Sequence, residues 1–172
     1  MSSAVKESVL DLALLRRARS GDPAALVEFA TRFWPIVSRV AWSMLGSASQ
    51  TVAATEEVLG VALHSQEPPA APVRVSMYRL AIWLAIIRRR SCRSAPRLQT
   101  PVFEAMTGVD NQDRAVFVLR DVERLSIAEV ATILESSPAE VLAQAHRARL
   151  QLTRALGQAA EALDMDVERL SA

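Results

Sequence analysis

The sequence is poor in the residues from which catalytic and metal centres are built. Its 172 residues include one cysteine, Cys92, two histidines, His64 and His146, and five glycines. A single cysteine excludes an internal disulfide and a metal cage made of cysteines alone. The glycines are too scattered for a phosphate-binding loop, and the two histidines lie on different predicted domains. We therefore expect no catalytic residues, no metal and no cofactor, and we do not expect an enzyme.

Long apolar runs are also missing. The longest, at residues 80–87, is far shorter than the ~20 apolar residues that a membrane-spanning helix needs. The chain does not open with a basic stretch, an apolar core and a small-residue cleavage site, so a secretory signal is not indicated. We expect no membrane insertion and a cytoplasmic location. The hydrophobic content of 51% and the charged content of 23% indicate a folded chain.

Acidic residues are absent from one long stretch. The net charge is only +1, but residues 68–103 contain seven arginines and no acid. Basic segments hold phosphate backbones, so nucleic acid is a candidate partner, and a solvated basic face is the alternative. Between Arg124 and Arg147 the pattern reverses, because that interval holds three glutamates and no lysine or arginine. The basic stretch contains Arg74, Arg79, Arg88, Arg89, Arg90, Arg93 and Arg97.

Apolar residues recur at three- and four-residue steps through the first half of the chain. This spacing is typical of amphipathic helices. In the first of these helices we expect Val5, Val9, Leu12 and Leu15 to face the core, with Leu14 as a further candidate. The pattern predicts four helices, near residues 4–19, 23–45, 47–64 and 73–91.

Two helix starts follow each other closely in the second half. Ser126 with Glu129, and Ser137 with Glu140, have the spacing of capping boxes, in which serine and glutamate side chains satisfy the free amides of the first turn. Pro138 at the first helical position supports the second start. Two such starts eleven residues apart predict a helix-turn-helix. A plain helical hairpin is the alternative.

These patterns predict an all-α protein of two domains. A four-helix bundle occupies residues 1–91, and a domain containing the helix-turn-helix occupies residues 110–160. A proline-containing linker at 92–109 joins them, and an acidic tail follows at 161–172. The second domain opens with a helix predicted over 110–123. Its expected inward residues are Val116, Phe117, Leu119 and Val122.

Three stretches carry a resemblance to a known family. They are GDPAALVEFATRFWPIVSRVAWSMLG (Gly21 to Gly46), RAVFVLRDVERLSIAEVATIL (Arg114 to Leu134) and HRARLQL (His146 to Leu152). Together with the order of elements, they resemble a two-domain extracytoplasmic-function sigma factor of bacterial RNA polymerase, in the sigma-70 family. The resemblance implies that residues 1–91 correspond to sigma region 2 and residues 110–160 to sigma region 4.

The resemblance also implies partners and site residues. In such factors the third helix docks on core RNA polymerase, and the matching acidic residues here are Glu56 and Glu57. The fourth helix opens and reads the −10 region of the promoter, and the helix-turn-helix faces the −35 duplex. The expected partners are core RNA polymerase and promoter DNA, and an anti-sigma factor or another regulatory protein is left open as a third. The DNA-binding residues that follow are Arg79, Arg88, Arg89, Arg90, Arg93, Gln144, Arg147 and Arg149.

Several positions favour a second hypothesis. Apolar residues replace the polar residues of the family at Ala53, Val61, Trp83, Ile87 and Leu142. Such replacements leave folding intact while they remove contacts to nucleic acid and polymerase. The alternative function is therefore a degenerate sigma-fold protein that lacks promoter activity and regulates through protein–protein contacts.

Overall fold

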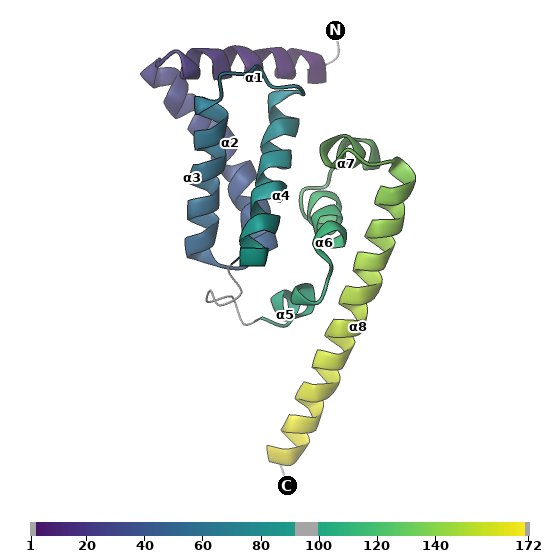
Figure 1. Cartoon of the computed structure of the whole chain (residues 1–172). Helices are drawn as coiled ribbons and strands as arrows, with labels where there is room; N and C mark the ends of the chain where they lie inside the picture. Colours follow the sequence, from purple (N-terminus) through teal and green to yellow (C-terminus); the bar gives the residue numbers. More distant parts are fainter. Residues whose placement is uncertain (1–2, 92–99, 171–172) are drawn as a thin grey trace. The chain divides into compact units, whose positions relative to one another are not determined.

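The computed structural model describes residues 3–91 and 100–170, and the side chains of residues 7–91 and 100–161. Every regular element in these ranges is helical, as the sequence predicts (Figure 1). The chain divides into two compact units. The N-terminal unit is built from α1 (Ser3–Arg19), α2 (Pro23–Leu45), α3 (Ala48–His64) and α4 (Val73–Ser91). The C-terminal part of the chain forms α5 (Pro101–Thr107), α6 (Asn111–Phe117), a π-helix (Val118–Val122), α7 (Ile127–Leu134) and α8 (Pro138–Leu170).

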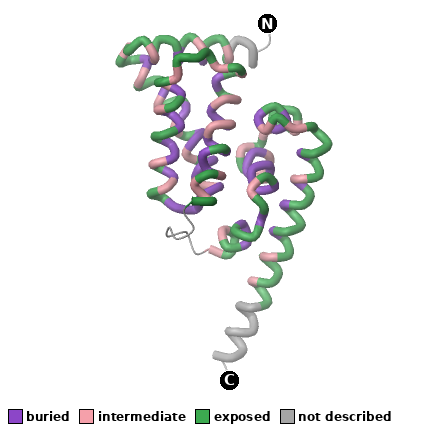
Figure 2. Tube along the Cα trace, in the orientation of Figure 1, coloured by how far each residue is buried: buried purple, intermediate pink, exposed green. Residues whose placement is uncertain are grey.

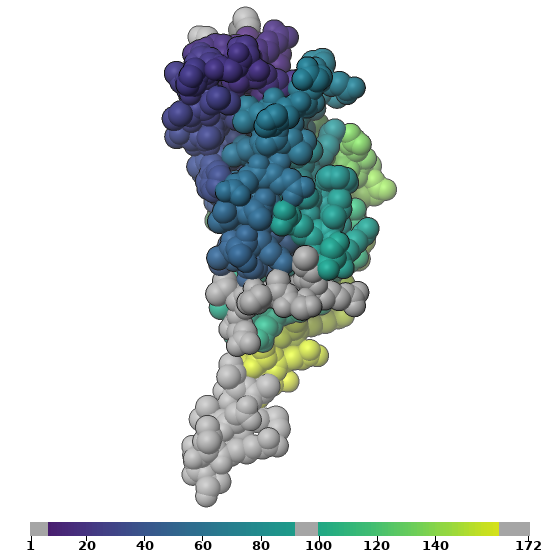
Figure 3. Space-filling model, turned by 60° about the vertical axis from the view of Figure 1, so that its left-hand side comes forward, coloured from purple at the N-terminus to yellow at the C-terminus, as the bar shows by residue number. Residues whose placement is uncertain are grey.

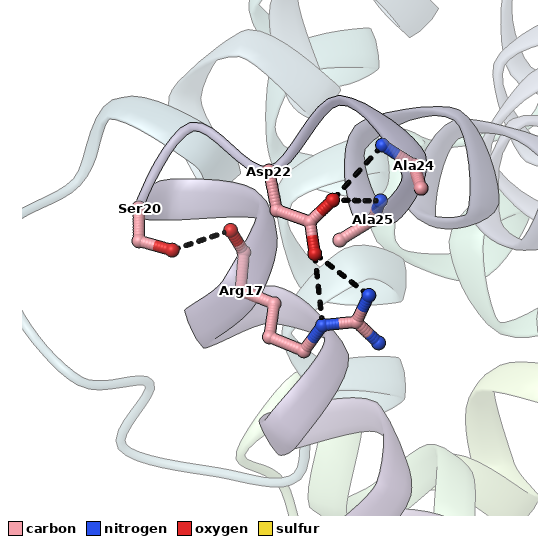
Figure 4. A network of polar contacts seen from close by, with 5 residues as sticks. All are labelled: Arg17, Ser20, Asp22, Ala24 and Ala25. Carbon is pink, nitrogen blue, oxygen red and sulfur yellow. Dashed lines mark hydrogen bonds and ion pairs between the residues drawn. The ribbon is translucent and has the colours of Figure 1, made fainter.

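Helix α2 is the centre of the N-terminal unit because it packs against α1, α3 and α4. Its start is fixed by Asp22, whose carboxylate accepts hydrogen bonds from the backbone amides of Ala24 and Ala25 (Figure 4). The same carboxylate accepts two hydrogen bonds from Arg17, which joins the end of α1 to the start of α2. The helix ends at Gly46, whose φ of 65° is a left-handed conformation that glycine adopts without strain.

The buried face of α2 supplies the core of this unit. Phe29 and Phe33 are fully buried and their ring centroids lie 4.7 Å apart. Burying an aromatic pair of this kind adds about 0.5–1.5 kcal/mol to the gain from area alone. Val37, Val40 and Met44 extend the same apolar face toward the end of the helix. The four-helix bundle predicted from the spacing of apolar residues is confirmed.

The orientation of α1 differs from the prediction. Leu15 is buried as expected, but Val9 is 58% exposed and Leu12 is half-buried, while Val5 lies outside the described side chains. Instead Asp11 is buried, with its carboxylate 2.6 Å from Nε of Arg32 on α2. Burial raises the pKa of Asp11, and the neighbouring Arg32 partly offsets this effect. The ion pair therefore turns the polar Asp11 toward α2, which the apolar spacing does not reveal.

Both capping boxes of the helix-turn-helix form as predicted. The Glu129 carboxylate accepts hydrogen bonds from the backbone amide and the hydroxyl of Ser126, and the Ser126 hydroxyl accepts one from the Glu129 amide. Ser137 and Glu140 repeat the same reciprocal pattern. These bonds lower the pKa of the Glu140 carboxyl. The helices α7 and α8 thus start where the sequence places them.

A π-helix interrupts the helix predicted over residues 110–123. The amide of Glu123 bonds the carbonyl of Val118 at 2.9 Å, five residues back instead of four. The wider turn changes which residues point inward. Leu119 is buried as predicted and Val118 joins it, but Val122 is 43% exposed.

Two further ranges differ from the predicted boundaries. Residues 101–107, expected in the linker, form α5, which begins at the Thr100 cap and packs against α8. Met106 and Ala105 are buried there, so this short apolar segment belongs to the C-terminal unit. Helix α8 continues without a break to Leu170, through most of the predicted acidic tail. No glycine with a left-handed conformation or proline interrupts it, since Gly157 stays helical.

Candidate nucleic-acid and polymerase interface

Helices α3 and α4 pack together and carry the two predicted site groups of the N-terminal unit. In the space-filling view of Figure 3 they form a continuous blue and teal surface. Glu56 and Glu57 are both exposed on α3. Arg88 on α4 reaches across and places Nη2 2.6 Å from Oε2 of Glu57. The structure thus joins a predicted polymerase contact to a predicted DNA contact.

The other predicted arginines of α4 have different surroundings. Arg89 donates a hydrogen bond from Nη1 to the carbonyl of Met44, at the end of α2. Arg90 is exposed in the last turn of α4, and Arg79 is half-buried nearer its start. Arg93 lies outside the described residues. Arg74 is exposed as well and pairs with Glu7 on α1. Among the described arginines of the basic stretch, Arg74 and Arg90 are therefore exposed, whereas Arg88 and Arg89 hold neighbouring helices.

Arg147 on α8 is held by a buried carboxylate. Its guanidinium donates two hydrogen bonds to Asp113, from Nε at 3.0 Å and from Nη2 at 2.8 Å. Asp113 is 4% exposed, so the pair fastens α8 to α6. The hydrogen bonds and charge of Asp113 raise the pKa of Arg147. Paired geometry of this kind is the strongest that arginine makes with a carboxylate.

Arg149 is held in a similar way two residues later. Its Nη2 lies 2.5 Å from Oδ1 of Asp121 in the π-helix, and this contact raises the pKa of Arg149. The side chain of Arg149 is nevertheless about half exposed, so its outer guanidinium edge still faces solvent. Sequence reasoning selected both arginines but missed Asp113 and Asp121. The sequence does not single them out, because the same predicted helix also contains Asn111, Gln112, Arg114, Arg120 and Glu123.

Gln144, the predicted base-reading residue, has its side-chain oxygen buried. No donor among the described residues bonds this Oε1 atom. Reading an adenine needs both the oxygen and the nitrogen of a glutamine amide to reach the base edge. Because Oε1 is buried in this conformation, the Gln144 amide does not present its oxygen and its nitrogen to a base edge together.

Arg114 was also missed. Its side chain is 1% exposed, and Nη1 donates a hydrogen bond to the carbonyl of Met106 at 2.8 Å. This bond ties α6 to the end of α5. Arg114 follows four polar residues at the start of its helix and is therefore expected to face solvent, so the sequence gives no sign of its burial.

None of the helices among the described residues is both long and apolar enough to span a bilayer. No cluster of three or more histidine, cysteine, aspartate or glutamate side chains in that part of the chain has a metal-binding arrangement.

The C-terminal part of the chain matches a protein family, and the fold is similar to solved structures. Residues 102–152 match the family model described as sigma-70, region 4. CnrH, solved in complex with the cytosolic domain of CnrY, superposes with a TM-score of 0.66 at 22% identity, covering 86% of this chain and 97% of that one. The sigma factor RpoE of Bartonella quintana, solved with the anti-sigma factor NepR, superposes with a TM-score of 0.60 at 14% identity. The match covers 77% of this chain and 96% of that one. At these identities the likeness shows a shared fold. No curated protein sequence matches the chain.

Proposed function

We propose that this chain is a sigma factor of the sigma-70 family, of the extracytoplasmic-function group, that joins core RNA polymerase and directs initiation at promoters. The match of residues 102–152 to region 4 carries this proposal. The all-helical N-terminal unit, with its acid-free basic α4, supports it. Such a factor positions polymerase and carries no catalysis of its own.

In this proposal, residues of α3 and α4 contact polymerase and the −10 strand, and residues of α8 contact the −35 duplex. Glu56 and Glu57 on α3 contact polymerase. Arg79 and the arginines at the end of α4, with Arg93 beyond it, hold the backbone of the opened −10 strand, where a basic groove offsets the cost of unstacking. On α8, the exposed edge of Arg149 contacts phosphate at the −35 duplex, while Arg147 keeps the helix in place for it. The Asp113 contact makes Arg147 chiefly a positioning residue.

Transcription in vitro tests this function directly. Purified chain added to core polymerase should bind it at micromolar concentration and yield transcripts from a subset of promoters. Because phosphate contacts release counterions, these transcripts should fall steeply as salt rises. Absence of core binding at this concentration would overturn the proposal.

A protein that holds the factor inactive is a further proposed partner. The solved structures of CnrH and RpoE each contain a second protein, and NepR is named an anti-sigma factor. By likeness of fold, we expect an anti-sigma factor for this chain. Co-purification from the native cells, probed for polymerase subunits and for a second small protein, measures both partners together.

The second candidate function is a regulator that acts only through protein contacts. Two observations favour it: the ion pairs that hold Arg88, Arg147 and Arg149, and the exposure of apolar side chains such as Trp83, which is 61% exposed. If this candidate is right, the chain binds a protein partner but leaves core polymerase inactive at every promoter. Restoring polar character with Trp83→Asn should then weaken partner binding.

A further inference from the structure

A hollow lies in the N-terminal unit where the connection between α3 and α4, residues 65–72, passes beside α1. Its volume is about 280 Å³, and residues of α1, α3, α4 and the connection line it. The connection contains no helix and none of its residues is buried, so Figure 2 draws it in green and pink. Three helices and one exposed segment of the same unit therefore form the walls of the hollow.

These walls are largely aliphatic. Leu15 comes from α1, Val61 from α3 and Met77 from α4, and the connection adds Pro68 and Pro69. Leu15 and Met77 are buried, whereas Val61 is 49% exposed. No aromatic side chain is among the described residues that line the hollow. A nucleobase gains much of its affinity from stacking on an aromatic ring, so these walls suit an aliphatic chain better than a base.

The polar side chains at the hollow are bonded to the backbone around it. The guanidinium of Arg19 donates from Nε at 2.9 Å and from Nη2 at 2.8 Å to the carbonyl of Ala62. Its Nη1 donates to the carbonyl of Glu67 at 2.8 Å. The hydroxyl of Ser76 donates to the carbonyl of Ala71 at 3.4 Å. Because a polar ligand would compete with these bonds, polar contacts add little to the affinity of the site.

Charge does not favour an ion in the hollow either. Arg79 and Glu67 bring opposite charges to its lining, and an ion that enters aliphatic surroundings loses its hydration without a matching partner. Pockets for drug-sized ligands usually measure ~300–1,000 Å³, so this hollow suits a smaller molecule. A water molecule in the liquid occupies ~30 Å³ and a methylene group is of similar size, so a chain of about eight carbons fits.

We propose that the hollow binds a small uncharged aliphatic molecule, of which a straight-chain alcohol is the simplest example. Its chain packs against Leu15 and Met77, and its hydroxyl group stays in water beside the exposed connection. Because Arg19 ties α1 to the connection that leads into α4, the bound molecule stabilises this end of the N-terminal unit by mass action. The chain thereby has a site for a small-molecule effector. This inference does not depend on promoter recognition and holds under either candidate function.

Nuclear magnetic resonance on the ¹⁵N-labelled full chain tests the site with n-butanol, n-hexanol, benzyl alcohol and hexanoate as probes. The amide signals of residues 61–80, which include most of the lining, should shift with n-hexanol in a saturable way. Binding of n-hexanol should be about fifteenfold tighter than that of n-butanol, because it buries two more methylene groups. Benzyl alcohol and hexanoate should bind more weakly than n-hexanol, since the first carries a ring and the second a charge.

Two exposed valines of α3 supply a matched pair of variants. Val61 lines the hollow and is 49% exposed, whereas Val52 is 47% exposed and is not among the lining residues. Val61→Asn should weaken n-hexanol about fivefold, because the hollow loses about half of the contact that a buried valine makes. Val52→Asn should leave the affinity unchanged.

Other results overturn the proposal of an aliphatic site. These are the absence of saturable shifts with n-hexanol, equal affinity for n-butanol and n-hexanol, and hexanoate or benzyl alcohol binding as tightly as n-hexanol. Equal affinity of the two asparagine variants, when their helical circular dichroism matches that of the unsubstituted chain, would also overturn it. A single-stranded oligonucleotide that shifts residues 61–80 when n-hexanol does not would mark the hollow as a base pocket instead. Transcription with core polymerase, measured separately, decides the proposed function, so the failure of one proposal leaves the other standing.

Discussion

The ion pair between Glu57 and Arg88 predicts that Arg88 is not available to bind DNA when the chain is free of polymerase. Glu57 belongs to the proposed polymerase surface and Arg88 to the proposed −10 surface, yet their charged atoms lie 2.6 Å apart. A polymerase group that takes over Glu57 would release Arg88 for phosphate. We therefore expect Glu57→Gln to strengthen the binding of single-stranded DNA when polymerase is absent.

The size of the effect follows from the exposure of the pair. The side chains of Arg88 and Glu57 are 26% and 48% exposed, so solvent screens them substantially. Pairs of this type contribute about 0.2–1 kcal/mol, which corresponds to a rise in affinity of up to about fivefold. One additional phosphate contact should also steepen the dependence of log K on log salt by about 0.7 for a single strand.

Fluorescence anisotropy of a labelled oligonucleotide, titrated with the full chain over a series of salt concentrations, measures both quantities. Glu56→Gln is the matched control, because Glu56 is a neighbouring exposed acid on the same helix and its removal changes the net charge equally. Only Glu57→Gln should change the salt dependence, and it should lose its effect in an Arg88→Gln background. Equal behaviour of the two glutamine variants would refute the reasoning, because the gain would then come from net charge alone.

Three further predictions concern stability. Leu119→Ala empties a fully buried position and should cost about 2–5 kcal/mol in urea unfolding of the C-terminal unit; a loss under 1 kcal/mol would contradict its place in the core. Asp113→Asn should lower the melting temperature by several degrees, as should Arg147→Gln, whereas a purely phosphate-binding Arg147 would leave it unchanged. Hydrogen bonds from Arg17 and from two backbone amides lower the pKa of Asp22. The charged Asp22 therefore stabilises the folded chain fully above the unfolded pKa of ~3.9, and this stabilisation is lost as pH falls through the lower folded pKa. The melting-temperature difference from Asp22→Ala should therefore be largest near neutral pH and shrink in acid; a difference that grows in acid would contradict this sign.

Local signals predicted much of the fold. The helix start at Asp22, the end at Gly46 and the two capping boxes depend on residues within four positions of each other, so they are legible in the chain itself. The same holds for the basic residues of α4. What the arginines contact was not legible, because the carboxylates that hold Arg88, Arg147 and Arg149 lie 28 to 34 residues away in sequence.

The π-helix shows a second limit of periodicity. A regular spacing of 3.6 residues per turn predicted that Val122 is buried. In the structure the wider turn at residues 118–122 places Val122 at the surface, where it is 43% exposed. The π-helix directly follows α6, which packs against α8. The sequence pattern alone does not predict the wider turn.

The amino-acid order by itself determined which segments are helical, where most of them begin, and which family the chain resembles, because capping and amphipathic spacing act over one or two turns. Only the tertiary structure decided which side of α1 is buried and which charges are paired. It also formed the aliphatic hollow beside the connection between α3 and α4. Ion pairing and burial depend on groups that meet only after helices pack, so a carboxylate thirty residues away can turn an expected DNA contact into a structural one.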